Sequence, residues 1–171
     1  MPRVQLIESR DQADPEQQEV YDHIGSTRGG NVGRPFAVLL HRPEIARAAA
    51  DLGSVIRFQS TLSDHDRELA IVTTAIERDC DFEWQAHRPL ASEAGVSDET
   101  LEAVAGGTDM ADDRDARIVA YARSLARTGK VDETTYEDAD ALFGESGIVE
   151  LTAIVGYYTM LAMLMNAAEA C

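Results

Sequence analysis

Residues 63–87 read SDHDRELAIVTTAIERDCDFEWQAH and predict two consecutive helices. The run SDHD supplies capping side chains for the first helix, in which Leu69, Val72 and Ile76 recur at helical spacing. The second helix is predicted over 79–94, because a glycine follows it directly. We therefore expect a helical fold around this stretch.

The rest of the chain shows the same patterning. No stretch alternates apolar and polar residues as a half-buried strand would, and no Asn-Gly or Asp-Gly pair marks a hairpin. Four glycines between positions 25 and 33 indicate a loop. We predict an all-α protein. Further helices are predicted over residues 15–24, 43–59, 97–106, 112–127, 132–143 and 146–168, with a short apolar segment at 35–40.

Length and charge limit the classes of protein and partner. A chain of 171 residues with 44% apolar residues is expected to fold as one domain over 1–171. Its 31 acidic and 15 basic residues give a formal net charge of −16. Nucleic acids and anionic membrane surfaces carry charge of the same sign, so we expect neither as a partner.

The cysteines and the first residues indicate a compartment. Cys80 and Cys171 are the two cysteines, and they form no disulfide framework. Residues 1–8 contain no apolar stretch of the length of a signal peptide. A reducing cytoplasm is therefore the expected location.

One segment near the end is long and uncharged. Residues 151–168 approach membrane-spanning length, but they include threonine, glycine, tyrosine and asparagine, and Glu150 and Glu169 bracket them. A helix this apolar must cover its surface, and its methionines suit a helix interface. We therefore predict a buried helix in a soluble homo-oligomer and no membrane span.

Residue types that can carry out chemistry gather in the quoted stretch. On a helix, Cys80, Glu83 and His87 fall within about 60° of one another, with Trp84 beside them. Glu68 lies on an otherwise apolar face of the preceding helix, where a carboxylate needs a partner or must take up a proton. Together these side chains predict an acid/base cluster.

Less specific interpretations remain open for each of these residues. An i,i+4 pair such as Glu83 and His87 occurs on many solvated helices, and a single Cys80 is often a small buried apolar residue. The Glu-x-x-His spacing of helix-bundle metal sites is not repeated, so no metal is expected. The other histidines, His23, His41 and His65, are interpreted as loop or capping residues.

The motifs resemble those of the carboxymuconolactone decarboxylase family, which includes alkylhydroperoxidase D. The central match is RELAI at 67–71 followed by CDFEWQAH at 80–87, and the resemblance extends over about 14–168. It implies an all-helical fold and homo-oligomers such as trimers or hexamers. Further matching runs are DPEQ at 14–17, GRPF at 33–36, HRPE at 41–44, LASEAGVS at 90–97 and GYYTML at 156–161.

The resemblance also indicates which branch of the family fits. The peroxidase branch uses a Cys-x-x-Cys pair, a histidine four residues after the second cysteine and a glutamate twelve before the first. Glu68, Cys80 and His87 occupy three of these positions, while Glu83 stands where the second cysteine would be. The decarboxylase side of the family, which needs no redox dithiol, is therefore the better match.

The function expected from this match is proton transfer on a small carboxylated lactone or keto acid, without a cofactor. His87 is the expected acid/base, and Glu83 and Glu68 orient it or relay the proton. Cys80 is a second donor or a wall of the pocket. A thiol peroxidase or oxidoreductase, and a non-catalytic binding member of the family, remain alternatives. The candidates for contacting an acidic substrate are Trp84, Arg88 and Arg42.

Overall fold

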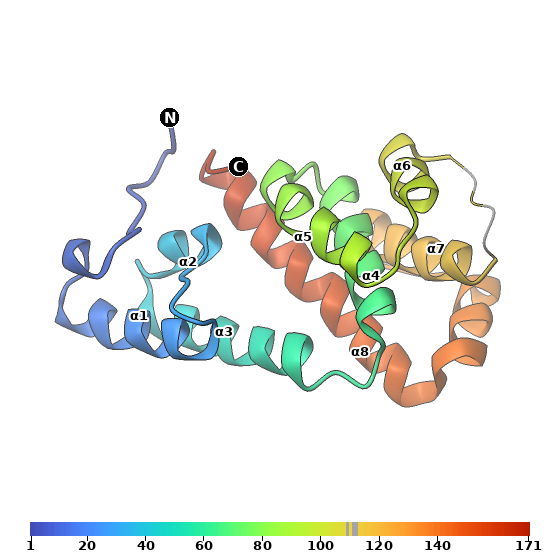
Figure 1. Cartoon of the computed structure of the whole chain (residues 1–171), viewed down its shortest axis with the longest axis horizontal. Coiled ribbons are helices and arrows are strands. Elements are labelled where there is room, and N and C mark those ends of the chain that lie inside the picture. Colours follow the sequence, from blue (N-terminus) through green and yellow to red (C-terminus); the bar gives the residue numbers. More distant parts are fainter. Residues whose placement is uncertain (109, 111–112) are drawn as a thin grey trace. The chain divides into compact units, whose positions relative to one another are not determined.

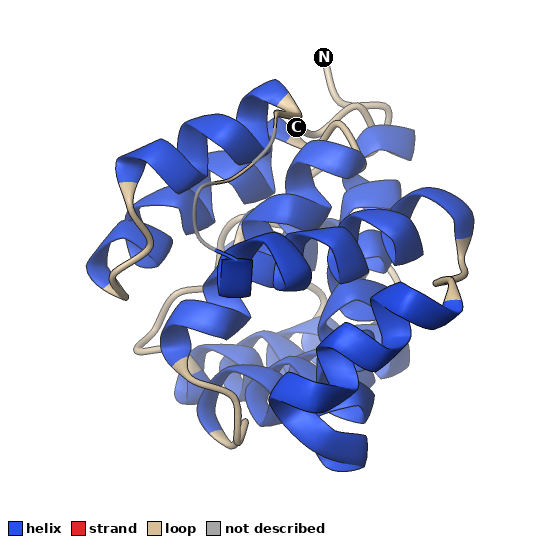
Figure 2. Ribbon diagram, turned by 90° about the vertical axis from the view of Figure 1, so that its right-hand side faces the viewer, coloured by secondary structure: helices blue, strands red, loops and turns tan. Residues whose placement is uncertain are grey.

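The computed structural model describes residues 1–108, 110 and 113–171, and its described part consists of helices and loops without a strand (Figures 1 and 2). The predicted all-α fold is confirmed. The predicted helix start at Asp112 lies outside the described residues. The α-helices are α1 (Pro15–Thr27), α2 (Arg34–Leu39), α3 (Pro43–Phe58), α4 (Asp64–Glu77), α5 (Asp81–Glu93), α6 (Asp98–Gly106), α7 (Asp113–Thr128) and α8 (Glu133–Ala167), and a short 3-10 helix covers Arg10–Gln12.

The chain divides into two compact units. The first comprises residues 1–59 and 164–171, and the second comprises 60–163. The expectation of one domain over 1–171 stays a prediction. The sequence motif at 67–87 lies entirely in the second unit, so the geometry of the candidate site can be described within that unit alone.

The first unit is built on α1 and α3, which pack against each other, and α2 also contacts α3. Helix α1 begins as its sequence predicts: Pro15 occupies the first turn, and the carboxylate of Asp14 accepts a hydrogen bond from the Gln17 amide at 2.9 Å. The Gln17 side chain in turn accepts from the Asp14 amide at 2.9 Å, which completes a capping box.

Helix α4 is the centre of the second unit. It packs against α5 and α7 and also contacts α6 (Figure 1). Every residue from Asp66 to Ala75 is buried, so this part of α4 is covered on all sides. The hydroxyl of Ser63 accepts a hydrogen bond from the Asp66 amide at 3.1 Å and caps the helix. Charged groups at the start of such a helix must find partners inside the protein.

A tight turn joins α4 to α5. Asp79 adopts a left-handed backbone conformation with φ 48°, and the Cys80 amide donates to the Ala75 carbonyl at 3.0 Å. Cys80 is the N-cap residue of α5 and its carbonyl accepts from the Trp84 amide at 3.1 Å. The turn therefore directs α5 back along α4, which brings side chains from the two helices together.

Helix α8 consists of two helical segments that meet at Gly144. That glycine has φ 64° and ψ 179°, which is not a helical conformation, and the break lies between the two helices predicted at 132–143 and 146–168. By length and composition α8 could cross a membrane, but half of its most apolar 18-residue stretch is buried in the protein. The interpretation as a helix of a soluble protein stays a prediction.

Candidate active site

The candidate site begins with one short hydrogen bond between α4 and α5. Nδ1 of His87 lies 2.7 Å from Oε2 of Glu68, although the two residues are 19 positions apart. Both side chains are buried. The tautomer follows from this contact: a carboxylate can only accept, so Nδ1–H donates to Glu68. The bond fixes the orientation of the ring and leaves Nε2 as the nitrogen that can exchange a proton.

Glu83 faces this second nitrogen. It lies one turn before His87 on α5, is buried, and places Oε2 at 3.6 Å from His87 Nε2. The imidazole therefore lies between two buried carboxylates, one at hydrogen-bond distance and one slightly beyond it. Each ring nitrogen of His87 therefore faces a carboxylate of its own. We call these three residues the Glu68–His87–Glu83 cluster.

Arg67 provides positive charge next to the cluster. Its Nη2 lies 3.5 Å from Oε1 of Glu68, and its Nη1 lies 2.9 Å from Oδ1 of the exposed Asp64. A buried carboxylate is costly unless it is paired, and here Glu68 contacts a guanidinium on one oxygen and an imidazole on the other. The sequence interpretation missed Arg67, and the signal that could have found it is a charged residue beside Glu68 in an apolar run.

Tyr158 of α8 is a second residue that the sequence interpretation missed. Its ring meets the His87 ring edge to face, with centroids 5.0 Å apart and an interplanar angle of 84°. Tyr157 packs against Tyr158 in the same manner at 5.3 Å. Edge-to-face contacts of this kind restrict ring rotation, so Tyr158 holds the imidazole from the side of α8.

The other predicted site residues lie in different settings. Cys80 is buried at the start of α5, and neither Cys80 nor Cys171 forms a disulfide within the described residues. Trp84 is half-buried on α5. Nη2 of Arg88 lies 3.3 Å from Oε1 of Glu102, so Arg88 is paired with a carboxylate of α6. Arg42 is exposed in the other unit, next to Glu44. Roles for these residues in catalysis or substrate binding stay predictions.

The other three histidines have ordinary partners. Nε2 of His41 lies 2.7 Å from the Gln5 carbonyl. Nε2 of His23 lies 2.6 Å from the carboxylate of Asp51. Nδ1 of His65 lies 3.4 Å from Oδ1 of Asp66. Within the described parts of the chain, no group of three or more His, Cys, Asp or Glu side chains is arranged to hold a metal ion.

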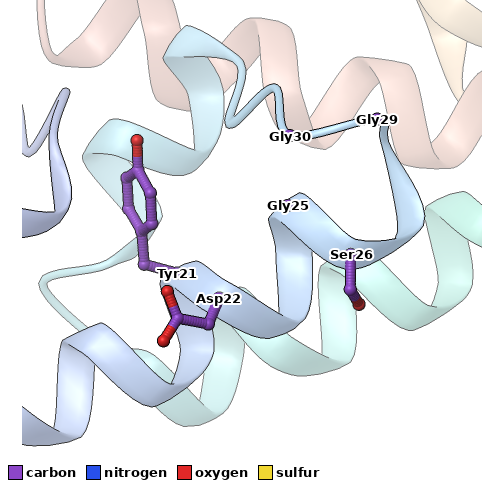
Figure 3. Close-up of a pocket in the computed structure, with 6 residues that line it drawn as sticks. All are labelled: Tyr21, Asp22, Gly25, Ser26, Gly29 and Gly30. Atoms are coloured by element: carbon purple, nitrogen blue, oxygen red, sulfur yellow. The ribbon is translucent and has the colours of Figure 1, made fainter.

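A surface depression of about 410 Å³ lies elsewhere, between α1 and the glycine loop that follows it (Figure 3). Its polar side chains already have partners within the first unit. The Tyr21 hydroxyl donates to the Glu8 carbonyl, Asp22 pairs with Arg10, and the Ser26 hydroxyl donates to the His23 carbonyl. None of the predicted site residues lines this depression.

The buried Glu68–His87 pair joins two helices of an all-α fold, and a protein-family model matches this part of the chain. The model of the carboxymuconolactone decarboxylase family matches residues 43–135, which is more than half of the chain and includes all of α4 and α5. The chain therefore belongs to the carboxymuconolactone decarboxylase family. A search of curated protein sequences found no match.

Several solved structures have a similar fold. One is the alkylhydroperoxidase AhpD core of an uncharacterized peroxidase-related protein from Ralstonia eutropha JMP134, with TM-score 0.79, 17% identity, and coverage of 99% of this chain and 91% of that one. Another is a variant of the debrominase Bmp8 in complex with 2,3,4-tribromopyrrole, with TM-score 0.77, 13% identity, and coverage of 98% and 90%. An uncharacterized peroxidase-related protein from Silicibacter sp. TM1040 gives TM-score 0.75, 18% identity, and coverage of 98% and 90%. At these identities the similarity shows a shared fold.

Proposed function

We propose that the chain is an enzyme that transfers protons on a small carboxylated lactone or keto acid, as a carboxymuconolactone decarboxylase does. The observation that carries the proposal is the buried cluster in which His87 contacts Glu68 at 2.7 Å and faces Glu83 at 3.6 Å. A titratable ring held in one orientation between two carboxylates has the parts of a general acid/base and its relay.

The proposed reaction divides into two steps. The bond between the carboxyl carbon and its neighbour breaks, carbon dioxide leaves, and the bonding electrons move onto the adjacent carbonyl oxygen as an enolate. Nε2 of His87 then delivers a proton to carbon, and the enolate collapses to the carbonyl. In this scheme Glu68 fixes the imidazole through Nδ1, and Glu83 returns a proton from solvent to Nε2.

The thiol peroxidase alternative has less support from the residues. Such a cycle needs two thiols in reach of each other, and position 83 carries a carboxylate one turn after Cys80. Cys171 is the only other cysteine in the sequence, and it lies far from position 83 along the chain. Acid/base chemistry uses the residues that the cluster contains, and so it is the function we favour.

The decisive experiment is a screen of γ-lactone carboxylic acids and β-keto acids for decarboxylation and isomerisation. We expect His87→Ala to lower the rate by about 10²-fold or more, the usual contribution of a general acid/base. The matched control is His23→Ala, which removes another histidine–carboxylate pair, in the other unit, and should leave the rate unchanged. Wild-type activity in His87→Ala, or no turnover of any compound by the wild type, would overturn the proposal.

We also propose the setting in which the enzyme works. The substrate is a small molecule, nucleic acid and membrane are not partners, and the location is the cytoplasm. The net charge of −16 supports the exclusion of polyanionic partners. A homo-oligomer, such as a trimer or hexamer, is supported by exposed apolar residues on α8 that include Val149 and Met163.

A further inference from the structure

One nitrogen atom of Arg67, beside the Glu68–His87–Glu83 cluster, takes part in none of the contacts described above. Nε of Arg67 is buried and has no hydrogen-bond partner among the described residues. The two terminal nitrogens of the same guanidinium are both engaged, Nη1 with Asp64 at 2.9 Å and Nη2 with Glu68 at 3.5 Å. Arg67 as a whole is 9% exposed. The two terminal nitrogens therefore hold the side chain in place, and its Nε–H is a buried donor.

A buried donor with no acceptor is unusual, because a protein gives up the hydrogen bond that water would have made. A guanidinium in the interior is also costly unless it is paired and hydrogen-bonded. Pairing with Glu68 explains Nη2, and pairing with Asp64 explains Nη1. Neither contact involves Nε, which keeps one donor unused among the described residues.

The position of this donor matches the chemistry of the cluster. Arg67 contacts Oε1 of Glu68, and His87 contacts Oε2 of the same carboxylate. One carboxylate thus bridges the guanidinium and the imidazole. A proton donor for carbon and a cationic donor for oxygen are the two groups that protonation of an enolate requires.

We propose that Arg67 binds the carbonyl oxygen of the substrate through Nε–H and stabilises the negative charge that this oxygen gains. The inference rests on the proposed function and adds the group that the oxygen contacts. A carboxylate would be bound by two N–H groups in a fork, but the other nitrogens of Arg67 already contact Asp64 and Glu68. A single donor suits one oxygen, which is neutral in the substrate and charged after carbon dioxide has left. Arg67 thus favours the charged state over the neutral one.

The test uses two stable γ-lactones that need no turnover. Tetronate is a lactone enolate that is ionised at neutral pH, and 2(5H)-furanone is the matched neutral lactone. We expect the wild type to bind tetronate at least tenfold more tightly than furanone in calorimetric titrations. The NMR resonance of the Arg67 Nε–H group, assigned by its loss in Arg67→Lys, should shift on addition of tetronate.

Variants separate this inference from the proposed function. Arg67→Lys keeps a positive charge but has no Nε–H group, so its preference for tetronate should fall at least tenfold. The control Arg117→Lys changes an arginine that pairs with Asp113 on α7, and it should keep the wild-type preference. His87→Gln should lose turnover yet keep a preference for tetronate, because the probe requires no proton transfer.

Three results would overturn the role of Arg67. The first is that the wild type binds the two lactones equally or binds neither of them. The second is that Arg67→Lys keeps the wild-type preference for tetronate. The third is that tetronate does not shift the Nε–H resonance of Arg67. The last of these is measured on the wild type and does not depend on a variant folding. Failure of the substrate screen alone would affect the proposed reaction and leave the binding result standing.

Discussion

The carboxylate of Glu68 contacts two nitrogen-bearing side chains at once, with His87 Nδ1 at 2.7 Å from one oxygen and Arg67 Nη2 at 3.5 Å from the other. Helix α4 is covered on all sides here, so these contacts form in a low-dielectric interior. A hydrogen bond there is electrostatically stronger than one at the surface. The pair Glu68–His87 also joins α4 to α5, which makes it part of the packing as well as of the site.

Removing this carboxylate should therefore destabilise the protein. Glu68→Ala leaves Nδ1–H of His87 and Nη2 of Arg67 without their acceptor, and we expect the free energy of unfolding to fall by about 1–3 kcal/mol. The control Glu102→Ala removes an exposed partner of Arg88 and should cost under about 1 kcal/mol. Urea denaturation measures both, and equal midpoints for the two variants would contradict the prediction.

Stability should also fall in acid, because of Asp66 on α4. Burial alone would raise the pKa of Asp66, but hydrogen bonds from Arg114 and Ser63 outweigh it and hold the pKa below its ordinary value. A carboxyl group with a lowered pKa contributes stability above its unfolded-state pKa of about 4, and this contribution is lost as the pH falls through the folded-state pKa. We expect unfolding measured by urea at pH 7, 4 and 2 to show this loss.

The variant Asp66→Asn tests whether that group is responsible. It should be less stable than the wild type at pH 7 by about 1–3 kcal/mol, and the difference should shrink as the pH falls and the wild-type carboxyl takes up a proton. The exposed Glu99→Gln serves as the charge-matched control. A difference between Asp66→Asn and wild type that stays constant with pH would rule out the assignment to Asp66.

Much of this arrangement could be predicted from the sequence, because helical periodicity reports which face of a helix a residue occupies. It placed Glu68 on a buried face, and it separated the two segments that meet at Gly144. Periodicity is a local property, however. It carries no information about which residue of a distant helix meets a given face, and so Tyr158 on α8 was missed.

The choice among the arginines shows the same limit. Arg88 and Arg42 were the cations expected to contact an acidic substrate, and these roles stay predictions. In the structure Arg88 turns to Glu102 on α6. Arg67 was not among the expected site residues, and the partners that allow its burial, Asp64 and Glu68, become clear only in three dimensions.

The break in α8 should depend on glycine at position 144. Its φ of 64° with ψ of 179° lies in a region that side chains other than hydrogen rarely allow. Gly144→Ala should lower the unfolding free energy by about 1–3 kcal/mol. Gly106→Ala in α6 is the matched control, because an added Cβ would meet Thr108 at an ordinary 3.7 Å. Thermal denaturation that ranks the two variants equally would show that Gly144 is not required.

The exposed side of α8 after Gly144 predicts an oligomer. Val149, Met160 and Met163 recur at helical spacing and are 68%, 39% and 55% exposed, with the exposed Gly156 between them. Light scattering at micromolar concentration should give a multiple of the 18.6 kDa chain mass. High salt should not dissociate the assembly, because apolar contacts hold it and salt screens the repulsion between chains of charge −16.

Charged substitutions on this side test the oligomer directly. The double variant Val149→Glu with Met163→Glu should elute as a monomer while remaining helical, because it introduces charge into the apolar contact. Ala141→Glu, exposed on the segment before Gly144, is the control and should keep the wild-type mass. A wild-type monomer, or a double variant that still associates, would contradict the prediction.

The redox chemistry of the site should be limited by its single thiol. Cys80 is buried at the start of α5, and Glu83 occupies the position one turn later that the second cysteine of the pair would need. We expect no appreciable peroxide consumption with a dihydrolipoamide-type reductant, and no intramolecular Cys80–Cys171 disulfide under reducing conditions. Mass spectrometry of the alkylated protein measures the second point. Steady peroxide turnover that Cys80→Ser abolishes would instead favour the oxidoreductase alternative.

Replacing Glu83 by cysteine should reveal the residue that separates the two chemistries. Glu83→Cys restores a Cys-x-x-Cys spacing with Cys80, four residues before His87, so a peroxide-oxidised thiol would have a partner for disulfide formation. We expect this variant to gain dithiol-dependent peroxidase activity and to lose proton transfer on lactone acids. Glu83→Ser, which also removes the carboxylate but adds no thiol, is the control and should gain no peroxidase activity. If Glu83→Cys forms the disulfide yet consumes no peroxide, position 83 alone does not determine which chemistry the site performs.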